Sequence, residues 1–297
     1  MQETALERAR ELSCWSGPVS PEPLAGGLSN ANFTVVDNDR HYVVRVGADA
    51  PEHAVWRFNE ITVSRAAHLA GLSPGIHYFE PDVMVLDYIE GGQTLDEAAV
   101  RDPAMLPRVV ALVRRCHVQM PSRLEVPGPM FWVFNVNRRY VHLLDTKENR
   151  LRERLPGFVE LNRTLEGAVG PILPVFCHND LLAANMLDDG ERLWLIDWEY
   201  GGWNSALFDL ANLATNNGFG LEAEKRMLTL YFEAEPDQAL RYRYQAMKVA
   251  SLLREVLWGL VAERHSELGI DYPAYTDRRL ARLEWTQTEF EALESPD

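Results

Sequence analysis

The sequence predicts an α+β protein in which a small antiparallel sheet comes first and a larger, mainly helical part follows. Apolar runs on either side of a turn in residues 33–46 predict a β-hairpin, and the apolar run 83–89 predicts another strand. From Thr94 onward, apolar residues recur mostly at helical spacing. Glu90-Gly91-Gly92 forms a flexible joint, so we predict an N-terminal lobe over residues 1–90 and a C-terminal lobe over residues 91–297.

The N-terminal elements are bounded by turn residues and helix breakers. Residues 1–17 have a helical pattern, which Pro18, Pro21 and Pro23 end. The turn sequence 37–40 joins strands 33–36 and 42–46. A helix should follow, because four apolar positions before Gly71 share one side, namely Val55, Val63, Ala67 and Ala70.

The C-terminal part is predicted to contain several helices. Residues 104–118 and 221–234 carry apolar positions at helical spacing, and the apolar residues in 252–261 predict a buried helix. Residues 271–275 predict a short aromatic loop before a last helix.

The composition favours a soluble enzyme and disfavours some other classes. The chain has 297 residues, of which 46% are hydrophobic, and its 44 acidic and 29 basic residues give a formal charge of −15. Such a charge repels nucleic acid and attracts a small cationic substrate. The N-terminal segment has no apolar stretch typical of a signal peptide, and the apolar runs are too short to span a membrane. We therefore expect a cytoplasmic protein; the sequence predicts no oligomeric state.

The most informative motif lies at residues 178–197. His178-Asn179-Asp180 is followed by Asn185 and then by an apolar strand that ends at Asp197. Phosphoryl-transfer enzymes need a carboxylate that accepts the proton of the attacking hydroxyl, and oxygen ligands for Mg²⁺ on the nucleotide phosphates. Asp180 suits the first role, and Asn185 and Asp197 suit the second. The structural alternative is that these residues only cap turns and end a strand.

Residues before this motif are candidates for binding ATP. Ser29 and Asn30 lie in a glycine-containing loop that would cover the phosphates. Arg45 is a lone cation on an apolar strand, and an ion pair with Glu60 of the following helix would orient it toward the phosphates. The joint after residue 86 would contact the adenine through backbone groups and apolar side chains, with Asp87, Tyr88 and Ile89 as candidates.

Residues 177–187 and 196–212 resemble the choline and ethanolamine kinase family. This family belongs to a wider group with aminoglycoside phosphotransferases and thiamine kinase-like enzymes. The resemblance covers about residues 24–280 and implies a bilobal protein-kinase-like fold. It also implies ATP- and Mg²⁺-dependent phosphorylation of an amino alcohol such as choline or ethanolamine.

The resemblance also suggests candidates for binding a cationic alcohol through aromatic faces and a carboxylate: Glu199, Tyr200, Trp203, Trp258 and Tyr275. Each also has a core-packing interpretation. Choline kinases have a second Trp three residues before the one that matches Trp258, whereas this chain has Glu255 there. A carboxylate favours an ammonium that bears N–H groups, but Glu255 could instead pair with Arg254 or Lys248 on a solvated helix face.

Three interpretations remain open from the sequence. The first is a choline or ethanolamine kinase, and the second is a related thiamine kinase or an aminoglycoside phosphotransferase-like enzyme. The third is a non-catalytic kinase-like binding protein. The presence of Asp180 argues against the third, because a binding protein needs no base. We also expect Asp209 to be structural, with its carboxylate accepting hydrogen bonds from the loop that carries Asp180.

Overall fold

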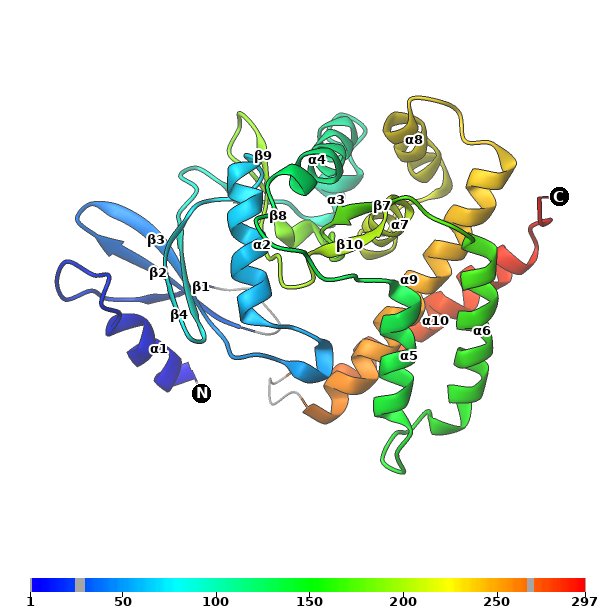
Figure 1. Cartoon of the computed structure of the whole chain (residues 1–297), viewed down its shortest axis with the longest axis horizontal. Helices are drawn as coiled ribbons and strands as arrows, with labels where there is room; N and C mark the ends of the chain where they lie inside the picture. The colour runs from blue at the N-terminus through cyan, green and yellow to red at the C-terminus, as the bar shows by residue number, and fades with distance from the viewer. Residues whose placement is uncertain (1, 25–29, 266–269, 297) are drawn as a thin grey trace.

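The computed structural model describes residues 2–24, 30–265 and 270–296. Its N-terminal part is built on a five-stranded antiparallel sheet, shown in blue and cyan at the left of Figure 1. The strand order is β1-β2-β3-β5-β4. The strands are β1 (Glu22–Leu24), β2 (Ala31–Asp37), β3 (Arg40–Val46), β4 (Ile76–Glu80) and β5 (Val83–Asp87).

The predicted hairpin is present as β2 and β3, which pair from Asp37 and Arg40 onward. Asn38 and Asp39 between them both have positive φ (49° and 60°), which suits the tight two-residue turns that match strand twist. Side chains alternate between the faces of a strand. Since Val44 is fully buried in the cluster beside helix α1 (Gln2–Arg10), Arg45 points to the opposite face.

Helix α2 (Arg57–Leu69) connects the sheet to the rest of the molecule. Its buried residues Val63, Ala66 and Ala67 belong to the large apolar cluster of the C-terminal part, as does Leu72, which follows the helix. The backbone carbonyl of Leu72 also accepts a hydrogen bond from Leu195 N–H at 2.8 Å. The lobe boundary at residue 90 stays a prediction, and α2 couples the two predicted lobes through this packing.

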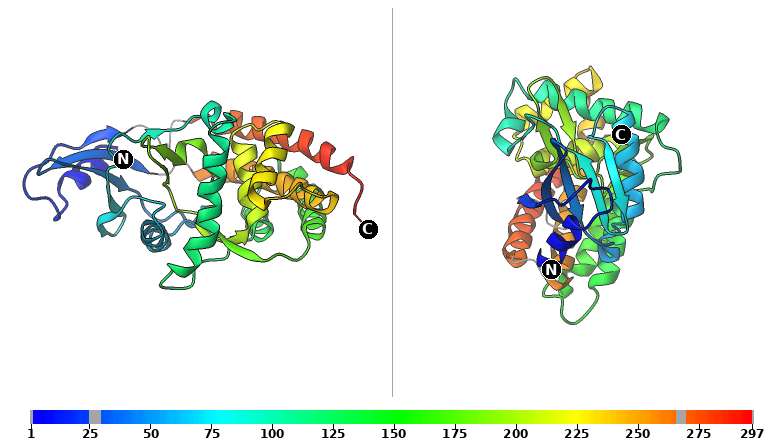
Figure 2. Two further views of the ribbon diagram at one scale, coloured as in Figure 1. Left: turned by 90° about the horizontal axis from the view of Figure 1, so that it is seen from above. Right: turned by 90° about the vertical axis from the view of Figure 1, so that its left-hand side faces the viewer.

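The C-terminal part is mainly helical, and α9 (Gln238–His265) runs through its centre with α5, α6, α7 and α10 packed against it (Figures 1 and 2). Residues 246–262 of α9 are nearly all buried because helices surround it. The other helices are α3 (Glu97–Arg101), α4 (Leu106–Gln119), α5 (Val133–Leu144), α6 (Leu155–Val169), α7 (Ala206–Asn216), α8 (Leu221–Phe232) and α10 (Tyr272–Glu291).

Two small sheets hold the segment that contains the predicted motif. β7 (Pro174–Cys177) pairs with β10 (Gly202–Ser205), and β8 (Met186–Asp188) lies between β6 (Gln93–Thr94) and β9 (Leu193–Leu195). The short 3₁₀ helix η4 (Ala183–Asn185) leads into β8. The loop after β7 and the loop after β9 therefore emerge close together.

Two predicted elements differ in the structure. The first helix ends at Arg10 rather than at residue 17, because turns over residues 11–14 precede the prolines. Residues 272–275 form the first turn of α10 rather than a loop: the Asp271 side chain accepts a hydrogen bond from Ala274 N–H at 3.0 Å, and Pro273 fits the first turn.

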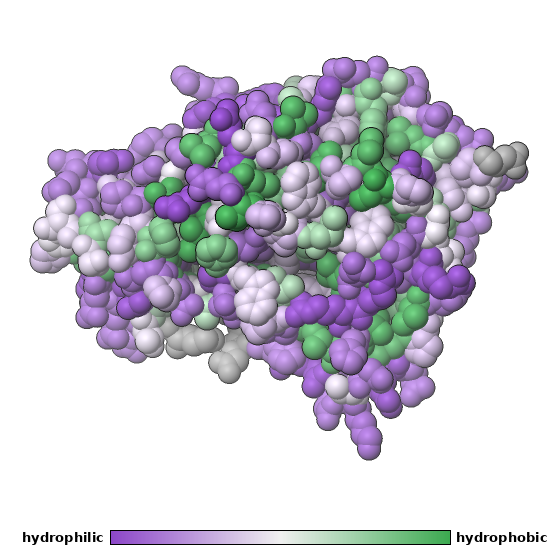
Figure 3. All heavy atoms as spheres, in the orientation of Figure 1, coloured by the Kyte–Doolittle hydropathy of each residue, from purple (hydrophilic) through white to green (hydrophobic). Residues whose placement is uncertain are grey.

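The surface is of mixed polarity. On the face shown in Figure 3, hydrophilic residues predominate at the edges, and apolar residues lie in small groups between them. Within the described part of the chain, the helices are too short or too polar to cross a lipid bilayer.

Candidate active site

Hydrogen bonds to Asp209 of α7 hold the loop that carries Asp180. This fully buried carboxylate accepts hydrogen bonds from the backbone N–H groups of His178 (2.9 Å) and Asn179 (2.8 Å). Its Oδ2 atom also lies 2.9 Å from Nε2 of His117 on α4. Burial alone would raise the pKa of Asp209, but the hydrogen bond and charge of His117, with those of His178, lower it. The predicted hydrogen bonds from the loop to Asp209 are therefore present.

His178 also braces the loop. Its Nε2–H donates to the carbonyl of Ile196 at 2.9 Å, while Nδ1 accepts from Asp180 N–H at 3.3 Å. These two bonds fit the neutral tautomer, and burial lowers the pKa of the ring. His178 therefore joins the two loops of the motif, as the sequence predicts, and is not placed to transfer a proton.

Asp180, Asn185 and Asp197 are brought together by these loops. The side-chain amide of Asn185 donates to the backbone carbonyl of Asp180 at 2.9 Å, and Ile196 N–H donates to the backbone carbonyl of Asn185 at 3.0 Å. Asn179 and Asp197 both have positive φ (65° and 67°), so one loop bends sharply next to Asp180 and the other at Asp197 itself. These contacts bring together the loops that carry the two carboxylates and the Asn185 amide, and the charge of Asp197 helps to raise the pKa of Asp180.

Arg45 joins this region from the sheet. Its Nε lies 3.0 Å from Glu60 Oε1, and its Nη2 lies 2.5 Å from Asp197 Oδ1. Glu60 is 2% exposed, and the Arg45 side chain 10%. Burial alone would lower the pKa of Arg45, but Asp197, Glu60 and Glu199 raise it, so the guanidinium stays charged. The predicted ion pair between Arg45 and Glu60 is therefore present.

A second arginine that the sequence analysis missed lies beside Arg45. Arg57 Nη1 is 2.5 Å from Glu60 Oε2 and 3.4 Å from Glu199 Oε2. Arg45 Nη2 is also 3.4 Å from Glu199. Burial and the charge of Asp197 raise the pKa of Glu199 to about 7 against the two arginines. Glu199 thus contacts both arginines, and its predicted role in binding the substrate stays a prediction.

Replacing Arg57 by Met is expected to destabilise the protein. The change leaves Glu60 and Glu199 to share Arg45, and removing one partner of a buried ion pair costs about 3 kcal/mol. Thermal unfolding would be measured against Arg65→Met, which removes an exposed arginine from the same helix. Equal stability of the two variants would contradict this role.

An aromatic cluster lies beside Asp180. Trp258 Nε1–H donates to the hydroxyl of Tyr200 at 3.1 Å. The Trp258 ring centroid is 5.1 Å from that of His53, 5.7 Å from that of Tyr275 and 6.1 Å from that of Tyr272. Burial and the charge of Arg254 lower the pKa of His53 to about 3, so its ring is neutral and can join an aromatic surface. The structure thus brings together Tyr200, Trp258 and Tyr275, as predicted.

A model of the choline/ethanolamine kinase family matches residues 22–226, more than half of the chain. The chain belongs to this family. Protein LicA of Haemophilus influenzae is 27% identical to it over 273 residues, which covers 86% of this chain and 76% of LicA. Ethanolamine kinase 2 of Mus musculus is 25% identical over 325 aligned positions, which covers 98% of this chain and 83% of that protein.

A solved structure agrees with this membership. The choline/ethanolamine kinase family protein from Mesorhizobium loti is 27% identical, with a TM-score of 0.77 over 97% of this chain and 96% of that one. The predicted protein-kinase-like α+β fold is thereby confirmed. A phosphotransferase that acts on an alcohol is the activity that the family and this site share.

Glu255, which departs from the family pattern, is not on a solvated face. It is 4% exposed, pairs with Arg254, and accepts a hydrogen bond from the Tyr275 hydroxyl at 2.5 Å. Lys248 pairs instead with Glu224 at 2.9 Å. The ion pair with Arg254 is present, but the solvated position is wrong because surrounding helices cover α9. The alternative interpretation, in which Glu255 favours an ammonium that bears N–H groups, stays a prediction.

Trp203 is placed with the core rather than with the Trp258 cluster. It lies on β10 opposite Phe176, and the two ring centroids are 5.6 Å apart. Its backbone bonds to Pro129 and Phe131, so the strand pairing that positions it directs the side chain against the core. The structure therefore favours the core-packing interpretation for this residue.

The structure describes some of the residues predicted to contact the nucleotide. Ser29 lies outside the described residues, and Asn30 lines a small cavity with Arg45 and Arg57. At the joint, Tyr88 N–H donates to the His41 carbonyl at 3.2 Å, and the Ile89 carbonyl accepts from Gly92 N–H at 3.0 Å. Asp87 ends β5, and its carboxylate lies 3.5 Å from Arg40. An adenine contact in residues 87–89 stays a prediction. The Tyr88 N–H and the Ile89 carbonyl already have hydrogen-bond partners within the protein.

One buried group has the residue types of a metal site. His117, Cys177 and Asp209 offer ligand atoms within 4.8 Å of one another, but the histidine also lies 2.7 Å from the Tyr231 hydroxyl and the thiol donates to the Ser205 carbonyl. We interpret this group as the support of the loop that carries Asp180.

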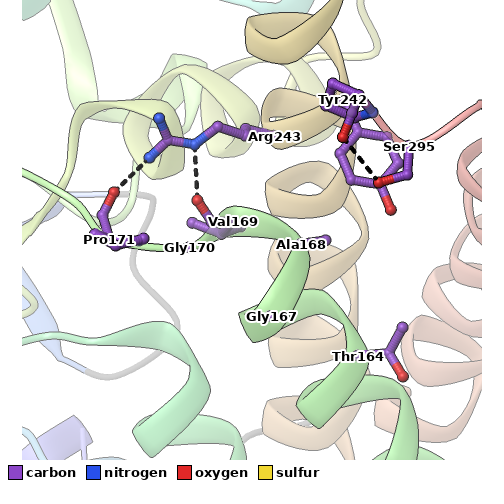
Figure 4. Close-up of a pocket in the computed structure, with 10 residues that line it drawn as sticks. Thr164, Gly167, Ala168, Val169, Gly170, Pro171, Tyr242, Arg243 and Ser295 are labelled. Carbon is purple, nitrogen blue, oxygen red and sulfur yellow. Dashed lines mark hydrogen bonds between the residues drawn. The ribbon is translucent and has the colours of Figure 1, made fainter.

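Figure 4 shows a surface hollow between α6, the start of α9 and Ser295, where Arg243 donates hydrogen bonds to the carbonyls of Val169 and Pro171.

Proposed function

We propose that this enzyme transfers the γ-phosphoryl group of ATP to the hydroxyl of an amino alcohol such as choline or ethanolamine. The observation that carries the proposal is the convergence of Asp180, Asn185 and Asp197 beside the ion pair of Arg45 and Glu60. This set supplies a base, metal ligands and a phosphate-binding cation in one place. A non-catalytic binding protein would have no use for the base.

The residues present suit Mg²⁺. The Asn185 amide nitrogen donates to the Asp180 carbonyl, which leaves its amide oxygen as the atom that could bind a metal. The Asp197 carboxylate is partly exposed, and an amide and a carboxylate oxygen are ligands that Mg²⁺ accepts. Bound there, the metal would neutralise charge on the nucleotide phosphates.

Asp180 would position the acceptor. Its carboxylate accepts the proton of the substrate hydroxyl while the oxygen forms a bond to the γ-phosphorus and the bond from that phosphorus to ADP breaks. Arg45 would hold the phosphates, and Glu60 would fix the guanidinium. The cluster around Trp258 would contact the cationic end of the substrate through aromatic faces.

A coupled assay of MgATP consumption tests this function. The acceptors would be choline, ethanolamine, a methylated ethanolamine, thiamine and an aminoglycoside. We expect saturable turnover with amino alcohols. Turnover with thiamine or the aminoglycoside alone would overturn the substrate class, and nucleotide binding without turnover of these acceptors or of hydroxy amino acids would favour a binding protein.

Replacing Asp197 by Ala is expected to raise the Mg²⁺ concentration needed for half-maximal rate by at least about tenfold and to lower turnover. The change removes one of the two proposed ligands and frees Arg45 from its contact at 2.5 Å. The measurement is a Mg²⁺ titration at saturating ATP, with the exposed Asp277→Ala as control. An unchanged titration would remove Asp197 from the proposed ligands.

The kcat/KM of the enzyme is expected to rise with pH up to about pH 8. Burial raises the pKa of Asp180 to about 8, Glu255, Asp197 and Glu199 raise it further, and Arg254 opposes them. Because the carboxylate is the active form, kcat/KM should fall about tenfold per pH unit below this value and level off above it. A profile that stays flat from about pH 6 to pH 9 would contradict this assignment of the base.

A further inference from the structure

A buried guanidinium lies where the acceptor should bind. Arg254 of α9, one helical turn before Trp258, is 3% exposed. Its Nη1 atom pairs with Glu255 and lies 3.9 Å from Asp180 Oδ1. A permanent positive charge therefore adjoins the carboxylate that is proposed to position the acceptor hydroxyl.

Arg254 also covers an aromatic face. Its Cζ lies 4.6 Å from the ring centroid of Tyr200 and 5.9 Å from that of Phe131. This is the geometry in which an aromatic ring binds a cation. The face of Tyr200 is thus occupied by a cation of the protein itself, and a trimethylammonium group placed near it would meet a like charge.

Two donor atoms of this guanidinium remain unused. Among the residues that the structure describes, Nε and Nη2 of Arg254 are buried without a hydrogen-bond acceptor. Buried donors on a charged group are costly when unpaired, so they call for an acceptor that the protein does not supply. The planar fork of arginine matches a carboxylate, with two parallel N–H···O bonds.

We propose that the acceptor of this enzyme is an amino alcohol that also carries a carboxylate, and that Arg254 binds this carboxylate through Nε–H and Nη2–H. The inference rests on the proposed function, which places the acceptor hydroxyl at Asp180. The ammonium group would lie against Trp258, because the ring of Tyr275 already has the guanidinium of Arg279 at 5.1 Å from its centroid. Within the amino alcohols of the proposed function, the preferred substrate class is therefore a hydroxy amino acid.

A contact with the γ-phosphate is the competing role for Arg254. The neighbours of Arg254 favour the acceptor: Glu255 accepts from Tyr275, whose ring contacts Trp258. The guanidinium groups of Arg45 and Arg57 already lie near Asp197 and Glu199, where the phosphates of the nucleotide are proposed to bind. The two roles predict different kinetic effects, because a phosphate contact would serve every acceptor equally.

Matched acceptors test the inference on the wild-type enzyme. L-serine is ethanolamine with an added carboxylate, and L-homoserine is related in the same way to 3-aminopropan-1-ol. Calorimetric titration in the presence of Mg²⁺ and a non-hydrolysable ATP analogue would measure the binding of each. We expect at least one carboxylated acceptor to bind about 10- to 100-fold more tightly than its counterpart. If neither does, the inference is overturned, even if ethanolamine is phosphorylated.

An Arg254→Met variant tests the residue. It should raise KM for the carboxylated acceptor at least about tenfold more than KM for its counterpart, because any effect of the lost charge on Asp180 is common to both acceptors, and Arg254→Lys should lie between the two. Arg241→Met removes an exposed arginine from the same helix and should change neither value. An equal change in KM for both acceptors would assign Arg254 to the phosphates or to Asp180 and overturn the inference. Absence of turnover with every acceptor would overturn the proposed function, whereas the wild-type titration still decides the substrate class.

Discussion

Replacing Asp180 by Asn should lower kcat by about 10²–10⁴-fold, because the variant cannot accept the proton of the attacking hydroxyl. The amide keeps the size of the carboxylate, and the backbone carbonyl of Asp180 still accepts from Asn185. The affinity for MgATP should therefore stay nearly the same, as a fluorescence titration can show. Asp277→Asn, on the exposed side of α10, is the control. Normal turnover of Asp180→Asn would exclude this residue as the base.

The same variant should be more stable than the wild type at neutral pH. The pKa of Asp180 is raised to about 8 in the folded protein, so between about pH 4 and pH 8 the folded state binds more protons than the unfolded state. The stability of the wild type must then fall as pH rises through this window, whereas an amide does not titrate. The difference in melting temperature should grow with pH up to about 8. A variant that is less stable at every pH would contradict the cost ascribed to burying this carboxylate.

Replacing Asp209 by Ala should destabilise the protein by about 3–5 kcal/mol and abolish most activity, because three buried donors lose their acceptor. The backbone N–H groups of His178 and Asn179 would be left unpaired, so the loop that carries Asp180 would shift. Denaturant unfolding measures the loss, and Asp145→Ala, which breaks an exposed ion pair, should cost at most about 1 kcal/mol.

The pH dependence of this loss separates the charge from the shape of Asp209. Its pKa is lowered in the folded protein, so its contribution to stability is present above the unfolded pKa of about 4 and is lost as pH falls through the lower folded value. The difference in unfolding free energy between Asp209→Ala and wild type should stay constant from about pH 5 to pH 7 and shrink under strongly acidic conditions. A gap that does not shrink would assign the effect to packing alone.

The parts of the site that could be predicted from sequence are those fixed by short spacing. Asp180 and Asn185 lie five residues apart on one loop, and Asp209 follows a strand that pairs with the start of that loop. The ion pair of Arg45 and Glu60 required only a strand followed by a helix. In each case, local geometry leaves few alternatives for where the side chain can point.

The parts that could not be predicted depend on packing between distant segments. One interpretation of the sequence pairs Glu255 with Arg254 on a solvated helix face, but helices on several sides bury α9, and the two charges form an internal pair. Arg57 contacts Glu199 across 142 positions of sequence, which no local pattern indicates. Trp203 had the residue type expected of a cation-binding site, but the register of β10 against β7 turned it toward Phe176.

The most direct test of phosphoryl transfer at Asp180 is ³¹P NMR of a reaction that contains MgATP, an amino alcohol and either the wild type or Asp180→Asn. We expect a phosphomonoester signal of the acceptor that grows together with ADP in the wild type and is nearly absent in the variant. Formation of ADP and inorganic phosphate without a phosphomonoester, or equal phosphomonoester formation by both proteins, would contradict transfer to the acceptor with Asp180 as the base.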